Sequence, residues 1–160
     1  MNGMAGILHF AYGSNLDSAQ MRKRCPSNRV LEVAVLRNYT LAFTRFARRR
    51  GCGVADVVPE LGAVVWGRLY ELTQGDLDNL DQAEGANGTK TPPAYHRLTL
   101  MVEKGGDPSQ LVPAEVYVVP VADRGSYLPN QTYMDLILRG AREANLPPDY
   151  QAWLRSLPVA

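Results

Sequence analysis

Glu84 is the residue of this sequence best placed to transfer a proton. It lies near the end of a segment that predicts a helix over 73–84, which begins on a capping-box sequence and is followed by glycine. At 100° per residue, Glu84 falls close to the centre of the apolar stripe that Leu77 and Leu80 define. Burial disfavours a charged carboxylate and raises its pKa, so an inward Glu84 is a candidate general acid and base near neutral pH.

The other acidic residues of this segment have a different helical phase. Asp76 and Asp78 point well away from the apolar stripe and Asp81 lies at its margin, so we expect all three to be solvated. For Glu84 an alternative remains open, in which the helix end frays toward water or the carboxylate pairs with an arginine. Periodicity alone does not separate the two interpretations.

A second candidate for chemistry is the turn Tyr12-Gly13-Ser14-Asn15-Leu16, which follows a predicted buried strand. Glycine permits a tight turn, and successive backbone N–H groups at a helix start can face an anion. The turn is therefore a candidate carboxylate cradle or oxyanion hole. The alternative is an ordinary connection to a helix over about 17–24, capped by Asn15 or Asp17. The sequence signatures of phosphate-binding loops and of a serine nucleophile are absent here.

The elements that must position these residues are mostly strands. Short apolar or alternating runs predict strands at 7–12, 29–36, 39–46, 54–58, 64–72, 95–102 and 114–119. Two further helices are expected at 130–145 and 149–157. Because the helices do not alternate with the strands, the pattern favours an α+β barrel or sheet over a doubly wound nucleotide-binding fold. No linker divides the chain, so we expect one domain over 1–160.

Charge is unevenly distributed although the formal net charge is only +1. Residues 1–50 carry nine basic and two acidic residues, whereas residues 51–90 carry two basic and seven acidic ones. The Arg45–Arg50 stretch can form a solvated face, pair with the acidic block, or bind phosphate or nucleic acid. The near balance of charge favours the first two, and we expect no nucleic-acid partner.

The remaining residues exclude several classes of protein. Cys25 and Cys52 match no metal or redox spacing and are expected to be free thiols. His9 and His96 have no ligand partners at metal-binding spacing, so we expect them to be structural. No apolar run approaches the length of a membrane span, and the uncharged N-terminal stretch lacks the basic start of a signal peptide. A cytoplasmic location is expected.

Several segments together resemble the γ-glutamylcyclotransferase family in order and spacing. They are Phe10–Leu16, Val65–Tyr70 and Leu80–Gly85, which reads Leu-Asp-Gln-Ala-Glu-Gly. The stretches 127–133 and 140–150 are similar to the closing helices of the family. The resemblance implies a small mixed β-barrel with flanking helices and a cavity. It also implies a small-molecule γ-glutamyl substrate, which is converted to 5-oxoproline with release of an amine and without a cofactor.

The resemblance assigns roles by position. Glu84 would take a proton from the substrate ammonium and return it to the departing nitrogen, and the Tyr12–Leu16 turn would hold the γ-glutamyl headgroup. Tyr95, Tyr117 and Tyr133 match family tyrosines near the cavity. Residues 46–53 are more basic than in the animal enzymes, and an arginine-lined mouth would favour a leaving group that carries a carboxylate. The leaving amine and the oligomeric state stay open, as does a non-catalytic domain of the same fold that binds a small ligand or a partner.

Overall fold

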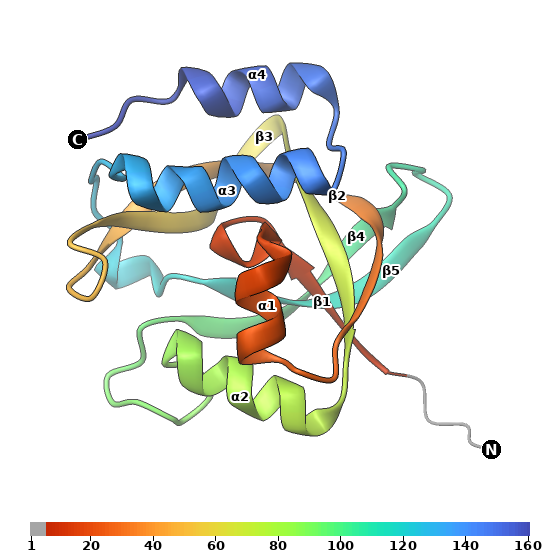
Figure 1. The fold of residues 1–160 in the computed structure, drawn as a ribbon, viewed down its shortest axis with the longest axis horizontal. Coiled ribbons are helices and arrows are strands. Elements are labelled where there is room, and N and C mark those ends of the chain that lie inside the picture. Colours follow the sequence, from red (N-terminus) through yellow and green to blue (C-terminus); the bar gives the residue numbers. More distant parts are fainter. Residues whose placement is uncertain (1–5) are drawn as a thin grey trace.

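Five strands form a closed barrel in this protein. The computed structural model describes residues 6–160, so the first five residues of the uncharged N-terminal stretch lie outside the described part. The strands are β1 (Ile7–Ala11), β2 (Arg29–Ala47), β3 (Cys52–Leu72), β4 (His96–Lys104) and β5 (Leu111–Val118), closed in the order β1-β3-β2-β4-β5 (Figure 1). β1 pairs antiparallel with β3 and parallel with β5. The predicted mixed barrel of the α+β class is confirmed.

β2 and β3 are longer than the sequence predicted. The strands expected at 29–36 and 39–46 are one strand, and those expected at 54–58 and 64–72 are also one. Asn38, with φ of 66°, does not end β2, because the ladder shifts register there and continues. Its side-chain oxygen accepts a hydrogen bond from the N–H of Gly62, which lies in the opposing bend of β3. The turn-forming residues Asn38 and Gly62 therefore lie in a bulge within two long strands, and neither residue ends its strand.

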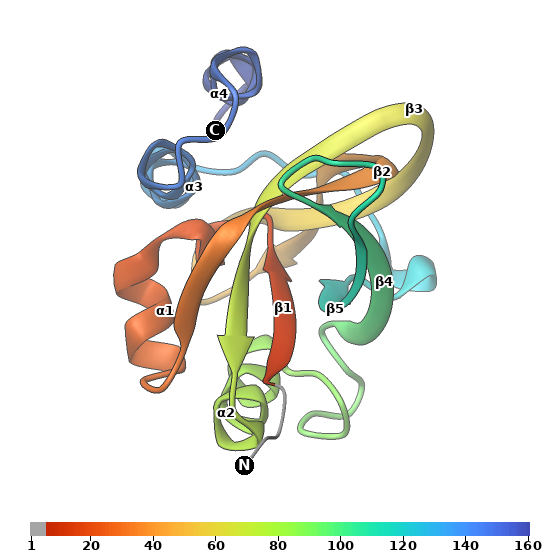
Figure 2. The ribbon, with the colours of Figure 1, turned by 90° about the vertical axis from the view of Figure 1, so that its right-hand side faces the viewer.

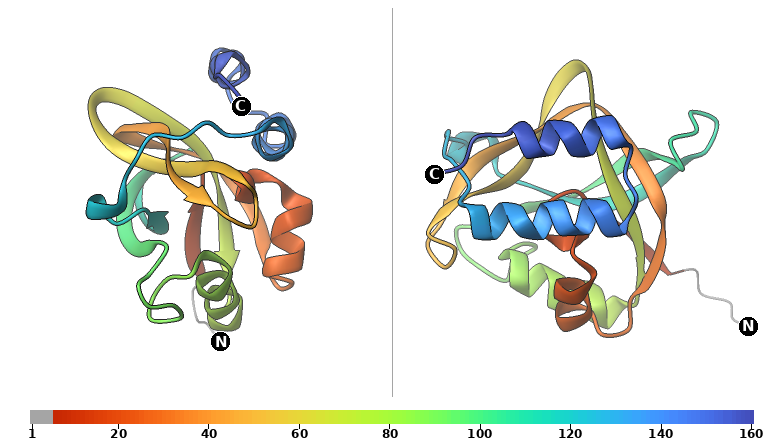
Figure 3. Two further views of the ribbon diagram at one scale, coloured as in Figure 1. Left: turned by 90° about the vertical axis from the view of Figure 1, so that its left-hand side faces the viewer. Right: turned by 45° about the horizontal axis from the view of Figure 1, so that its top comes forward.

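Four helices pack outside the barrel in the part of the chain that the structure describes. They are α1 (Ser18–Arg24), α2 (Gln74–Glu84), α3 (Gln131–Glu143) and α4 (Pro148–Ser156), with short 3-10 turns η1 (Ser14–Leu16) and η2 (Val121–Asp123). α3 and α4 lie side by side on one side of the molecule and α2 lies on the opposite side (Figures 1 and 2), and the further views agree (Figure 3). No helix among residues 6–160 has both the length and the apolar character needed to cross a membrane.

The helix ends follow the sequence closely. Thr73 and Asp76 form a reciprocal capping box at the start of α2, and Gly85 ends it in the left-handed conformation. Asp17 caps α1 by accepting a hydrogen bond from the N–H of Gln20. Of the two residues proposed as the cap of α1, Asp17 is therefore the one used, which leaves the side chain of Asn15 free for another role.

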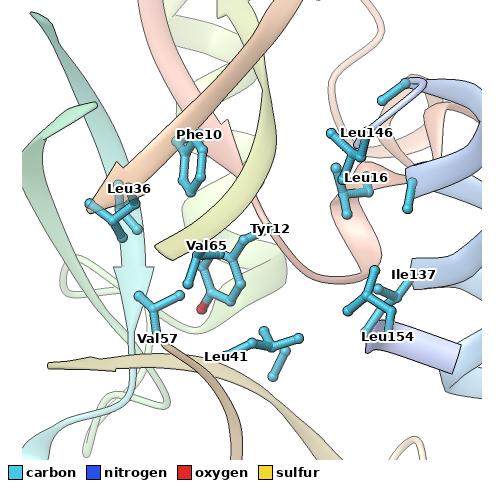
Figure 4. Close-up of a cluster of buried hydrophobic side chains, with 14 of the residues drawn as sticks. Phe10, Tyr12, Leu16, Leu36, Leu41, Val57, Val65, Ile137, Leu146 and Leu154 are labelled. Carbon is cyan, nitrogen blue, oxygen red and sulfur yellow. The ribbon is translucent and has the colours of Figure 1, made fainter. Parts of the chain in front are cut away.

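The apolar core continues from the barrel interior to the helices, as Figure 4 shows. Phe10, Leu36, Val57 and Val65 lie together at the barrel, while Leu16, Ile137, Leu146 and Leu154 pack between η1 and the helices α3 and α4. Leu16 is fully buried in this second group. The core therefore fixes the turn that follows β1 from the side of α3.

Candidate active site

A cavity of about 590 Å³ brings together the residues that the sequence selected. Its wall includes parts of β1, the turn that follows β1, the end of α2, and the tip where β2 turns into β3. Leu16 is the one predicted site residue that does not line the cavity, because its side chain belongs to the core. The others line it: Tyr12, Gly13, Ser14, Asn15, Glu84, Tyr95, Tyr117 and Tyr133.

Glu84 is the last residue of α2, and its side chain is directed into the molecule. Only 15% of that side chain is exposed. Its Oε1 accepts a hydrogen bond from Asn15 Nδ2 at 3.0 Å and lies 3.5 Å from Arg24 Nη1. Burial raises the pKa of Glu84 above its ordinary value, although Arg24 and Asn15 both act to lower it. The predicted inward position is confirmed, and the arginine pair that was its alternative is present as well.

Asn15 is held so that its amide points at Glu84. Its Oδ1 accepts hydrogen bonds from Arg24 Nη1 at 2.8 Å and from Gln20 Nε2 at 3.0 Å, which leaves its Nδ2 to donate to Glu84. Its backbone oxygen accepts from the hydroxyl of buried Tyr70 at 3.0 Å. Every polar group of this amide side chain thus has a partner, and such satisfied networks are rigid.

Gln20, Arg24 and Tyr70 are site residues that the sequence reasoning missed. Gln20 and Arg24 stand four residues apart, so they share one face of the predicted helix, and this spacing was a usable signal. Tyr70 gave no comparable signal, because its partner Asn15 is 55 positions away in the sequence. Only the pairing of β1 with β3 brings the two together.

Two of the cavity tyrosines hydrogen-bond to the backbone of one residue of β3, Ala55. The hydroxyl of Tyr95 donates to the backbone oxygen of Ala55 at 2.9 Å. The N–H of Ala55 in turn donates to the hydroxyl oxygen of Tyr133, also at 2.9 Å. Because Tyr133 is the acceptor in that bond, its own hydroxyl proton remains available to donate to a ligand.

Two acidic residues of α2 are buried, contrary to the prediction. Asp81 accepts hydrogen bonds from the Tyr117 hydroxyl at 2.6 Å and from Arg97 Nε at 2.9 Å. Asp76 accepts from the backbone N–H groups of Thr73 and Ser27. Both aspartates are only 3% exposed, because the flanks of α2 pack against partners on β4, β5 and the segment before β2, which helical periodicity cannot reveal. Asp78 is exposed, as expected.

The Arg45–Arg50 stretch lies at the cavity and not on a remote face. Arg45, Arg48, Arg49 and Arg50 all line it. Arg50 donates to Gln20 Oε1 at 2.9 Å, and its guanidinium lies 5.1 Å from the centre of the Tyr133 ring, a cation–π distance.

Pairing between the basic and acidic blocks occurs elsewhere. The bridges from the first 50 residues to residues 51–90 are Arg24 with Glu84 and Arg29 with Glu71. Within residues 6–160, none of the four arginines of the Arg45–Arg50 stretch has a carboxylate oxygen within 4 Å. Of the two favoured alternatives, pairing with the acidic block is therefore wrong for this stretch, whereas Arg48 and Arg49 are exposed to solvent.

The histidines and cysteines are held by the fold. The part of the chain from residue 6 onward contains no group of three or more His, Cys, Asp or Glu side chains placed to hold a metal. His9 Nδ1 is 3.0 Å from the backbone oxygen of Glu115, and burial lowers the pKa of His9 to about 4. Cys25 and Cys52 are both free, as predicted, and both are buried.

The hydroxyl of Tyr12 forms a hydrogen bond with the protein backbone. It donates to the backbone oxygen of Tyr117 at 2.6 Å, inside the core. Tyr12→Phe removes this donor and leaves a buried carbonyl without it, so we expect the free energy of unfolding to fall by about 1 kcal/mol in urea titrations. Tyr127→Phe, at a tyrosine that is 44% exposed, serves as the control and should change little. An unchanged urea midpoint for Tyr12→Phe would show that this bond contributes nothing to stability.

This chain is similar in sequence and in fold to several known proteins. A sequence model of the AIG2-like family matches residues 64–154. The bovine protein named γ-glutamylcyclotransferase is 29% identical over 155 residues, which cover 94% of this chain and 78% of the bovine one. The human protein of the same name is 27% identical with the same coverage. A solved structure titled γ-glutamyl cyclotransferase superposes with a TM-score of 0.87 at 26% identity, over 97% of this chain and 89% of that one.

Proposed function

Because the chain belongs to the AIG2-like family and is similar to γ-glutamylcyclotransferases over 94% of its length, we propose that it is a cyclotransferase acting on γ-glutamyl amides. The observation that carries the proposal is the largely buried Glu84 side chain, which accepts a hydrogen bond from Asn15 at the wall of a cavity large enough for a dipeptide. Such a pocket with a carboxylate of raised pKa is a typical setting for acid and base catalysis.

In the proposed reaction the substrate attacks itself. Glu84 accepts a proton from the α-ammonium, and the freed amine attacks the γ-carbonyl carbon to close a five-membered ring. The bond from that carbon to the leaving nitrogen then breaks. Two protons in all leave the α-nitrogen and two reach the departing amine, with Glu84 as their carrier. The products are 5-oxoproline and a free amine, and the reaction consumes neither water nor a cofactor.

The turn Tyr12–Leu16 is proposed to bind the γ-glutamyl headgroup. The backbone N–H groups of Leu16 and Asp17 close the 3-10 turn, so the amides of Gly13, Ser14 and Asn15 are the ones that a substrate oxygen can use. Tyr133 adds a hydroxyl donor at the same cavity. Oε2 of Glu84 has no hydrogen-bond partner among residues 6–160, so it is the oxygen proposed to take the proton.

Typical magnitudes of catalytic effects support the proposal that this small set of groups carries the reaction. Holding an intramolecular nucleophile in place lowers the barrier by up to roughly 7–11 kcal/mol in the best-oriented systems. One shuttling carboxylate contributes about 10²–10⁴-fold. The leaving amine is proposed to carry a carboxylate, since the arginines at the cavity mouth favour an anionic partner.

The function is tested by measuring 5-oxoproline release from a panel of γ-glutamyl amino acids and γ-glutamyl amines. We expect turnover of γ-glutamyl amino acids, and slower turnover of γ-glutamyl amines that lack the carboxylate. If the purified protein turns over no member of the panel, it is not a cyclotransferase for these substrates, and binding without turnover would identify a ligand-binding domain of the same fold.

The raised pKa of Glu84 makes a prediction for stability. A carboxyl group that binds its proton more tightly in the folded state loses stability as pH rises through the window from its ordinary value of 4.5 to its higher folded value. Glu84→Gln removes this cost, so the variant should be more stable than wild type at pH 7 and equal to it below about pH 4. Urea unfolding across pH 3–8 measures the difference. A variant that is less stable than wild type at every pH would contradict the prediction, because the pair with Arg24 would then outweigh burial.

A further inference from the structure

The charges around the cavity are far from balanced. Glu84 is the only acidic residue that lines the described cavity, against five arginines and Lys90. Arg24 is paired with Glu84, and Arg50 is held by Gln20 and the ring of Tyr133. Three further arginines have neither a carboxylate within 4 Å nor a side-chain hydrogen bond within residues 6–160: they are Arg45, Arg48 and Arg49.

These three arginines are placed near the tip of the β2–β3 hairpin. The chain turns there at 48–51 between paired Ala47 and Cys52. Arg48 and Arg49 are exposed, so their long side chains can move to meet a ligand at the mouth. Like charges gathered without counter-charges create a positive potential, which favours an anion entering the cavity.

A γ-glutamyl amino acid with a neutral side chain carries too little negative charge to balance these three arginines. Its headgroup carries one ammonium and one carboxylate, and the leaving amino acid adds a single further carboxylate. The headgroup is proposed to lie at Glu84 and the turn after β1, so only the leaving group's one negative charge would face the hairpin tip. A cluster of three uncommitted arginines can bind more charge than that.

We propose that the preferred leaving amino acid carries a second carboxylate, on its side chain, so that γ-glutamyl-glutamate and γ-glutamyl-aspartate are the best substrates. This inference rests on the proposed cyclotransferase function. Ring closure is unchanged: the same carbon–nitrogen bond breaks, and the amine that leaves is glutamate or aspartate in place of a neutral amino acid. The second carboxylate binds Arg48 and Arg49.

The test compares γ-glutamyl-glutamate with γ-glutamyl-glutamine, which has nearly the same shape and one negative charge less. Two exposed ion pairs of about 0.7 kcal/mol each sum to about 1.4 kcal/mol, which is about a tenfold preference in kcat/KM for the acidic dipeptide at low salt. The preference should shrink toward about threefold at 0.3 M salt, where exposed charges are screened. γ-Glutamyl-lysine, with the opposite side-chain charge, should be the poorest of the three.

The double variant Arg48→Gln/Arg49→Gln should bring the ratio of the two kcat/KM values close to one. Arg155→Gln provides the control, since Arg155 is an exposed arginine of α4 that does not line the cavity, and it should leave the ratio as in wild type. Equal kcat/KM values for the two dipeptides in the wild-type protein would overturn the inference while leaving the cyclotransferase function intact.

Binding distinguishes this inference from the function on which it rests. Calorimetric titration of Glu84→Gln with the same two dipeptides measures charge selectivity without turnover. Tighter binding of the acidic dipeptide supports the arginine cluster as its site, even if the wild-type protein releases no 5-oxoproline and the proposed function fails. Equal binding of the two dipeptides, or tighter binding of γ-glutamyl-glutamine, overturns the inference.

Discussion

We expect Glu84→Gln to lower kcat/KM for a γ-glutamyl dipeptide by about 10²–10⁴-fold, the usual contribution of the shuttling acid and base that Glu84 is proposed to be. Glutamine keeps the shape of the side chain and an oxygen that can accept from Asn15, but it cannot take a proton from the substrate ammonium. The folded structure should be retained, since burial disfavours the charge that the substitution removes. The measurement is 5-oxoproline release under conditions where kcat and KM are separated, and the loss should fall mainly on kcat.

The matched control for this variant is Asp78→Asn. It makes the same chemical change on the same helix, at a carboxylate that faces solvent, and should leave kcat/KM within about twofold of wild type. The wild-type protein should also lose activity as pH falls through the pKa of Glu84, with a midpoint above 4.5. If Glu84→Gln keeps most of its activity, another group carries the proton and the mechanism is wrong.

Gly140→Ala destabilises the protein by about 2–3 kcal/mol, because α3 lies directly on the turn that precedes α1. A Cβ at Gly140 would lie 2.6 Å from the backbone nitrogen of Asp17 and closer still to the carbonyl carbon of Leu16. Backbone atoms cannot rotate away, so α3 or the turn must shift. The better helix propensity of alanine, at most about 1 kcal/mol, offsets only part of the cost. Urea unfolding measures the loss.

The turn that Gly140 supports also carries Asn15, so Gly140→Ala should lower kcat/KM as well as stability. Gly75→Ala is the matched control: it is a helical glycine whose added Cβ would meet no atom closer than 3.8 Å. That variant should be neutral or slightly more stable, with unchanged activity. Equal stability of the two variants would mean that the contact between α3 and the turn tolerates a methyl group, against the packing argument.

The fold was predictable in class because its signals are local. The capping box and Gly85 bound α2, and the apolar face of α3 is buried as its spacing indicated. Strand lengths were not predictable in the same way. Asn38 and Gly62 have positive φ and are typical turn residues, yet both lie within a bulge that continuous pairing on either side stabilises. Turn-forming residues thus predict a bend in the chain, but they do not predict whether the strand continues beyond that bend.

Residues of the candidate site were predictable where the sequence of a single helix or turn determines their position. Helical phase placed Glu84 inward, and the strand-to-helix turn identified Asn15. Helical phase predicted a solvated Asp81, which is wrong. The partners of Asp81, Tyr117 and Arg97, lie on β5 and β4, and the sequence of α2 contains no pattern that indicates them. The position of the basic stretch was equally hidden, since the cavity contacts the tip of a hairpin that the sequence had divided into several strands.

The parallel pair of β1 and β5 closes the barrel next to the candidate site. His9 on β1 is the register partner of Glu115 on β5, 106 positions away, and β1 leads straight into the turn with Asn15. Joining such distant segments costs loop entropy, and folds rich in distant contacts form slowly. Hairpins and helices can form earlier, but Tyr12 at the end of β1 meets Tyr117 of β5 only when the barrel closes. We therefore expect the proposed site to be complete only after the barrel has closed.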